Sequence, residues 1–126
     1  DYVDKGDPYA AECHRTIHAL TTELGMSPDE WVNSFQSRLG PTQWLQPYTD
    51  ETVKKLAQEG VESIDVICPG FSTDCLETIE EIGMENKEYF IEEGGKEFNY
   101  IPALNDSPAH IQMMKNLVLR HTQGWD

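Results

Sequence analysis

The sequence predicts an α/β protein in one domain over residues 1–126, with three to four parallel strands and helices on both faces of the sheet. Segments with helical apolar spacing alternate with short apolar runs typical of buried strands, in the order α, β, α, β, α, β, α. This alternation favours parallel strands joined by crossover helices. A chain of 126 residues can also bury one adequate core, and no repeat or linker divides it.

Two helices are expected in the first half of the chain. The first begins at Asp7-Pro8, an N-cap residue followed by proline at the first helical position, and ends at Gly25. Its inward face comprises the apolar residues at helical spacing, namely Ala10, Cys13, Ile17, Leu20 and Leu24. The second begins near Thr49-Asp50 and ends at Gly60, with an inward face of Val53, Leu56 and Ala57.

Two further helices are expected in the second half. One runs from about Asp74 to Glu93, where Gly94-Gly95 stops it. On an ideal wheel of about 100° per residue its inward face is apolar, with Cys75, Leu76, Ile79, Ile82 and Phe90. The last helix begins at Ser107-Pro108, and its apolar stripe is formed by Ile111, Met114, Leu117 and Val118.

Strands are expected where β-branched and aromatic residues gather. Ser63–Cys68 is one strand, and the run from Phe98 to Ile101 is another. The segment Trp31–Arg38 is ambiguous, because its Trp, Val and Phe residues suit a short buried strand while Ser27–Glu30 resembles a helix capping box. A loop follows over residues 39–48, and its Trp44 either folds back onto the core or contacts a partner.

Composition excludes several classes of partner. Nine basic and 23 acidic residues give a formal net charge of −14, which would repel nucleic acid and anionic membrane surfaces. A metal cation or a cationic protein surface suits this field. The three cysteines are an odd number without a CxxC motif, as in a reducing compartment. We therefore expect a cytoplasmic protein, with a peripheral position at the inner membrane left open.

The stretch Pro69–Glu85, PGFSTDCLETIEEIGME, is the candidate functional segment. It leaves a buried strand through a short loop and becomes helical, which is where open α/β sheets bind ligands. Glu77, Glu81 and Glu85 are four residues apart and form a nearly straight acidic line. The pattern alone favours a solvated face. However, Glu77 lies in the first turn, where the positive helix end favours an ionised carboxylate that attracts a cation.

Three separated motifs carry a family resemblance. QSRLGPTQWLQPYTDETVKKL, CPGFSTDCLETIEEI and YIPALNDSPAHI, in this order, strongly resemble the C-terminal half of bacterial ferrochelatases, which insert ferrous iron into a porphyrin in haem synthesis. The resemblance covers essentially the whole chain. It implies two Rossmann-like halves with a porphyrin cleft between them, and a strand at Trp31–Arg38. It also implies protoporphyrin IX and Fe²⁺ as substrates and the enzyme's N-terminal half as a partner.

The resemblance assigns catalytic and relay roles to the acidic line. Glu77 matches the family's active-site glutamate, close to the porphyrin centre. Glu81 and Glu85 match acidic residues that lead away from this site and would relay protons or metal. They lie in a helix that the family widens to a π-type geometry, which would turn the line toward an interior cavity.

Four other positions receive roles from the resemblance. Trp44 and Phe71 match aromatic residues beside the porphyrin. Asp74 matches an aspartate that supports the helix start. Cys75 stands where some relatives carry a histidine, so a metal contact made by that histidine is not expected here.

The family's catalytic histidine has no match in this chain. It belongs to a Ser-x-His type motif expected just before Asp1, and it matches none of His14, His18, His110 and His121. We therefore expect a fragment that lacks its first strand and sister domain and is inactive alone. Dimerisation or strand swapping is one way to cover its exposed sheet edge. We expect no tightly bound cofactor, and no iron–sulfur cluster because no cysteine follows Cys75. The alternative is a non-catalytic Rossmann-like module that binds a partner protein or a divalent cation through its acidic face.

Overall fold

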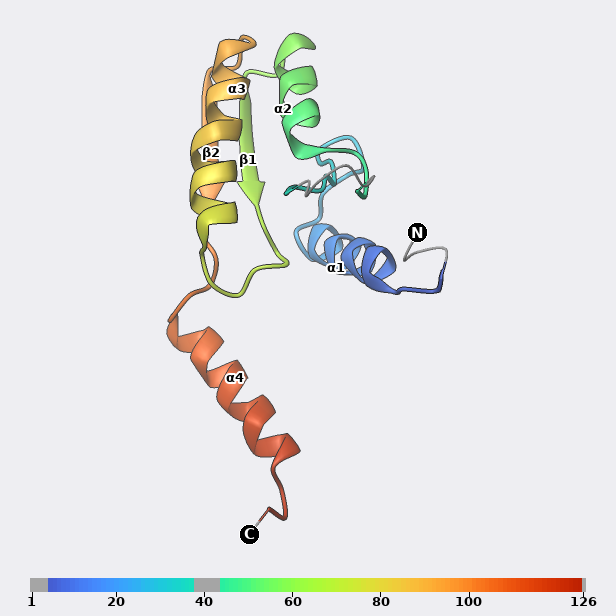
Figure 1. Ribbon diagram of the computed structural model, residues 1–126, viewed down its shortest axis with the longest axis vertical. Helices are drawn as coiled ribbons and strands as arrows, with labels where there is room; N and C mark the ends of the chain where they lie inside the picture. The colour runs from blue at the N-terminus through green and yellow to red at the C-terminus, as the bar shows by residue number, and fades with distance from the viewer. Residues whose placement is uncertain (1–4, 38–43, 126) are drawn as a thin grey trace.

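The structure is a computed structural model that describes residues 5–37 and 44–125. It confirms the α/β class and each predicted helix. The elements follow one another along the chain as α1 (Tyr9–Glu23), α2 (Thr49–Gln58), β1 (Ser63–Ile67), the π-helix η2 (Glu77–Asn86), α3 (Lys87–Glu92), β2 (Glu97–Ile101) and α4 (Pro108–His121) (Figure 1).

The sheet in the described residues has two parallel strands. Their register runs from Ser63 opposite Glu97 to Ile67 opposite Ile101, and η2 with α3 forms the crossover between them. Such a βαβ unit is consistent with a Rossmann-like half-domain. Helices α2 and α3 lie side by side along the sheet (Figure 1). The core forms between these helices, η2 and β2, from Val53, Ala57, Ile82, Phe90 and Phe98.

The prediction of a strand at Trp31–Arg38 is wrong over the described residues 31–37. That part is irregular and makes a single parallel bridge, between Phe35 and Tyr48. The Phe35 N–H donates to the Pro47 carbonyl oxygen at 2.8 Å, but proline has no N–H to extend the ladder. Two residues later, Ser37 adopts a left-handed backbone with φ 61°, which turns the chain away. The described residues therefore form two strands rather than three to four.

Helix α4 differs from the expectation in its surroundings. Its bounds agree with the sequence prediction, yet its apolar stripe, formed by Ile111, Met114, Leu117 and Val118, is exposed. The helix extends away from the sheet, and α1 lies apart from it as well (Figure 1). Within the described ranges, helices therefore do not cover both faces of the sheet. No helix in those ranges is long and apolar enough to cross a membrane.

Candidate active site

The helix that carries the acidic line is a π-helix over ten residues, Glu77–Asn86. The expected π-type widening is therefore present. It also overturns part of the predicted inward face, because Leu76 and Ile79 are 73% and 53% exposed while Thr78 and Asn86 are buried. A π-helix pairs residue i with i+5 and so contains more residues per turn than the ideal wheel assumes. Ile82 and Phe90 do face inward, as predicted.

Asp74 fixes the loop just before η2. Its carboxylate accepts hydrogen bonds from Tyr100 Oη at 2.6 Å, Asn105 Nδ2 at 2.8 Å and Thr78 Oγ1 at 3.0 Å. The bonds from Tyr100 and Asn105 lower the pKa of Asp74 to about 2. Burial, followed by the bond to Asp74, raises the pKa of Tyr100 to about 12. An ionised Asp74 thus ties the start of the acidic helix to β2 and to the loop that follows it.

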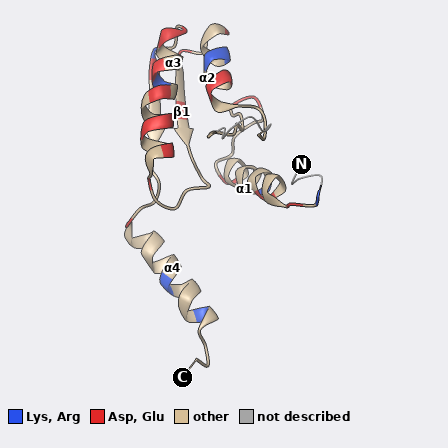
Figure 2. Ribbon diagram, in the orientation of Figure 1, with Lys and Arg blue, Asp and Glu red and all other residues tan. Residues whose placement is uncertain are grey.

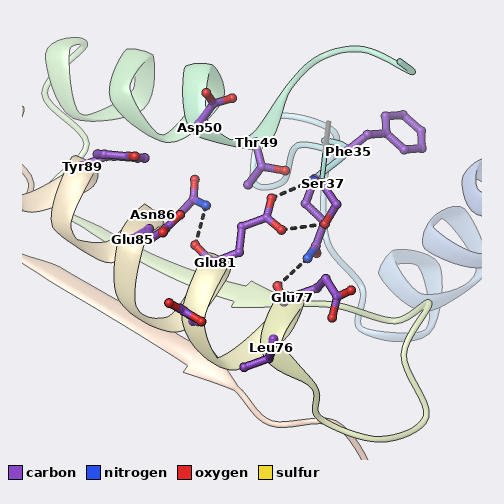
Figure 3. Close-up of a pocket in the computed structure, with 12 residues that line it drawn as sticks. Phe35, Ser37, Thr49, Asp50, Leu76, Glu77, Glu81, Glu85, Asn86 and Tyr89 are labelled. Atoms are coloured by element: carbon purple, nitrogen blue, oxygen red, sulfur yellow. Dashed lines mark hydrogen bonds between the residues drawn. The ribbon is translucent and has the colours of Figure 1, made fainter. Parts of the chain in front are cut away.

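A pocket of about 580 Å³ lies between η2, the segment Phe35–Ser37 and the start of α2. Its carboxylates come from two helices, with Asp50 on α2 and Glu77, Glu80, Glu81 and Glu85 on η2 (Figure 3). Figure 2 shows the same concentration of acidic residues along η2 and α3. The described lining residues include no lysine, arginine or histidine. The acidic line therefore faces an open pocket, and the interior cavity that the resemblance implies stays a prediction.

Three polar side chains hold this wall of the pocket in place. Ser37 donates to Glu81 twice, from its N–H to Oε1 and from Oγ to Oε2, both at 2.6 Å. Gln36 Nε2 donates to the Glu77 carbonyl oxygen at 2.5 Å, and Asn86 Nδ2 donates to the Glu81 carbonyl oxygen at 2.7 Å (Figure 3). The Asn86 Oδ1 atom is buried and has no hydrogen-bond partner among the described residues.

Glu77 and Glu85 are exposed, whereas Glu81 is half-buried. The pKa of Glu77 lies below its usual value, first because of a hydrogen bond with the Cys75 side chain and then because of its own backbone N–H. Glu77 is therefore ionised near neutral pH and accessible from the pocket. Cys68 contacts the pocket-lining residue Gln36, because the Cys68 Sγ donates to Gln36 Oε1 at 3.3 Å. Burial raises the pKa of the Cys68 thiol to about 11.

The structure does not bring all predicted residues to this pocket. Trp44 is 42% exposed and Phe71 is half-buried, and neither lines the pocket. Cys75 is half-buried and also lies outside the lining. No group of three or more His, Cys, Asp or Glu side chains within the described ranges converges as a metal site would require. The carboxylates of η2 therefore form a line and not a cluster.

Sequence reasoning missed several lining residues. Glu80 is absent from the predicted line because the four-residue spacing starts at Glu77, and only the wider helix accounts for its place in the pocket. Predicting that Asn86 lines the pocket would have required the same knowledge of the π-helical geometry. Ser37 and Gln36 belong to the first motif, QSRLG, so a signal was present, but their contacts with η2 join residues about 40 positions apart.

Comparisons with known proteins identify the family. The ferrochelatase family model matches residues 1–122. The chain is 58% identical over 125 residues to the ferrochelatase of Marinobacter nauticus, covering 99% of this chain and 34% of the relative. It is 56% identical over 124 residues to the ferrochelatase of Rhodopseudomonas palustris, covering 98% and 36%, and equally identical to that of Thioalkalivibrio sulfidiphilus, covering 98% and 34%. The chain spans about a third of the length of these relatives. With a family match over nearly its whole length, the chain belongs to the ferrochelatase family.

Proposed function

We propose that this chain is the C-terminal half of a ferrochelatase and supplies the acidic wall of the site where Fe²⁺ enters protoporphyrin IX. Family membership supports the reaction class. The observation that carries the proposal is the pocket itself, because a π-helix presents Glu77, Glu81 and Glu85 to one cavity.

The chemistry of metal insertion needs a base and a source of weakly held metal. Two pyrrole protons must leave the porphyrin, and the iron must shed water before it binds the ring nitrogens. Carboxylates suit both tasks because they accept protons and bind divalent iron. Glu77 is the proposed catalytic residue, since its carboxylate is exposed and lines the pocket.

Glu81 and Glu85 are the proposed relay between Glu77 and solvent. The two residues continue the line along η2, and Glu80 adds a fourth carboxylate to the same wall. Four ligands that converge would hold a cation, whereas carboxylates spaced along a helix suit its passage.

The porphyrin is assigned to aromatic side chains outside the acidic pocket. Trp44 has the exposure that a contact with a flat apolar ring requires, and Phe71 lies in the loop between β1 and η2. Asp74 and Cys75 have supporting roles. Asp74 accepts a hydrogen bond from Thr78 and so holds the start of the helix, and the Cys75 side chain forms a hydrogen bond with Glu77. Fe²⁺ and protoporphyrin IX enter this scheme as substrates, and we propose neither a resident cofactor nor an iron–sulfur cluster.

The opposite wall of the site is assigned to the N-terminal half of the same enzyme. No histidine lines the described pocket: His110 is buried and bonded to the Asn105 carbonyl oxygen, and His14 packs edge-on against Phe35. Because this chain is assigned one wall of the site, and no histidine lines its described pocket, we expect the 126 residues alone not to insert metal into porphyrin. Self-association of the isolated chain would be one way to cover its exposed apolar surface.

The test replaces Glu77 by glutamine in an enzyme of full family length that contains this chain. Loss of a general base is expected to lower kcat for iron insertion by about 10²–10⁴-fold. Glu88→Gln is the matched control, because Glu88 is exposed on α3 but does not line the pocket. Iron insertion at the parent rate in Glu77→Gln would refute the assignment.

A further inference from the structure

Ser37 directs both of its hydrogen-bond donors at a single carboxylate. Its N–H and its Oγ reach the two oxygens of Glu81, each at 2.6 Å (Figure 3). The backbone of Ser37 is left-handed, with φ 61°, a region that few non-glycine residues occupy. A strained residue of this kind persists where its surroundings over-determine it, and such positions gather at functional sites.

The segment that presents Ser37 is anchored at the two residues before it. Phe35 is buried and forms the bridge to Tyr48, and its carbonyl oxygen accepts the Thr49 N–H at 3.1 Å. Gln36 then reaches across to the Glu77 carbonyl oxygen. The donors of Ser37 therefore come from backbone that is held to the start of α2 and to η2.

Glu81 differs from its two neighbours on the acidic line. It is half-buried, its side chain accepts both bonds from Ser37, and its carbonyl oxygen accepts a bond from Asn86. Glu77 and Glu85 are exposed. The hydrogen bonds that lower the pKa of Glu77 are local, from Cys75 and from its own backbone N–H, whereas Glu81 is held from across the pocket. The middle of the line is thus fixed from across the pocket, and its two ends are more exposed.

We propose that Ser37 is a positioning residue that fixes Glu81 midway along the line, while Glu77 and Glu85 move with the cation or proton that they carry. This inference rests on the proposed function of the line. Three mobile carboxylates one turn apart would be able to converge on Fe²⁺ and retain it. A central carboxylate held at both oxygens does not follow the cation, so the cation is passed on. Ser37 acts only through Glu81.

The experiment uses the full-length enzyme and separates the hydroxyl from the backbone. Ser37→Ala removes Oγ and keeps the strained backbone, whereas Ser37→Gly removes Oγ and suits the left-handed conformation. Ser34→Ala is the matched control, because Ser34 Oγ contacts Thr49 Oγ1 at 3.0 Å and does not line the pocket. The measurements are kcat, KM for Fe²⁺, KM for protoporphyrin and the melting temperature.

We expect kcat to fall about tenfold in both Ser37 variants, as loss of a hydrogen bond to a charged group predicts. Both KM values should stay within twofold, and Ser37→Gly should melt no lower than the parent, which separates the effect from unfolding. Adding Ser37→Ala to Glu81→Gln should cost nothing further. If the decreases in kcat multiply in the double variant, or if the Ser37 variants keep the same kcat as Ser34→Ala, the role of Ser37 is refuted while the proposed relay is not. A fully active Glu81→Gln would overturn the relay and this inference together.

Discussion

Replacing Gly95 by alanine tests the core beneath the acidic helix. A Cβ atom on Gly95 would lie 2.2, 2.3 and 2.6 Å from Cε1, Cδ1 and Cζ of Phe90. Carbon atoms in contact stand about 3.5–4.0 Å apart, so the ring would have to retreat by more than about 1 Å. Phe90 is 0% exposed and tilts against Phe98 at a centroid distance of 6.1 Å, which leaves no open space for this movement.

The change in the free energy of unfolding expected for Gly95→Ala follows from two opposing effects. Overpacking a well-filled core costs about 1–3 kcal/mol, and a contact this short belongs at the upper end. Alanine also restricts the unfolded chain, which returns about 0.4–1 kcal/mol. We therefore expect Gly95→Ala to lower the free energy of unfolding by about 2 kcal/mol, or about thirtyfold in the equilibrium constant. Urea denaturation of the 126-residue chain, followed by far-UV circular dichroism, measures this change.

Gly83 is the matched control, since a Cβ there would meet its nearest atoms, Thr78 O and Tyr100 Cδ1, at 3.5 and 3.7 Å. Gly83→Ala should change the free energy of unfolding by less than about 1 kcal/mol. Adding Phe90→Leu to Gly95→Ala should relieve the contact, so the two losses should sum to more than the loss of the double variant. Additive losses, or a Gly95→Ala chain as stable as the parent, would refute the reasoning.

Two further predictions concern the helix start and the porphyrin contact. The pKa of Asp74 is lowered from 3.8 to about 2, so its ionised carboxylate stabilises the fold above about pH 4 and this contribution is lost as the pH falls toward 2. The stability gap between the parent and Asp74→Asn, measured by urea unfolding, should therefore narrow over that range; a constant gap would contradict it. In the full-length enzyme, Trp44→Ala should weaken protoporphyrin binding several-fold, as followed by porphyrin fluorescence. Unchanged affinity would remove Trp44 from the porphyrin wall.

Much of the fold was accessible from the sequence because local signals coincide there with tertiary structure. The four helices and two of the strands appear where capping residues, glycines and apolar periods indicated them. Gly60 and Gly94 follow α2 and α3 with φ 88° and 110°, so a side chain at either position would be strained. The inward residues predicted for α2, Val53 and Ala57, are also in the core.

The segment Trp31–Arg38 shows where local signals fail. Only half of the capping-box pattern forms. The Ser27 N–H donates to Glu30 Oε2, but Ser27 Oγ donates to the same oxygen and does not accept the Glu30 N–H, and no helix follows in the described residues. The apolar residues that suggested a strand yield one bridge, at Phe35. The extent of pairing depends on what the partner backbone can donate, and Pro47 donates nothing. This information lies a dozen residues away in the sequence.

The acidic line shows why the helical pattern and the observed geometry differ. On an ideal α-helical wheel, Glu77, Glu81 and Glu85 form an ordinary solvated face opposite an apolar one. The π-helix changes which residues are covered, burying Thr78 and Asn86 and exposing Leu76 and Ile79. What converts the acidic face into a pocket wall is then supplied from outside the helix, by Ser37 and its neighbours across the cavity. Helix type and long-range contact therefore decide together whether a row of carboxylates is a surface or a site, and neither can be read from spacing alone.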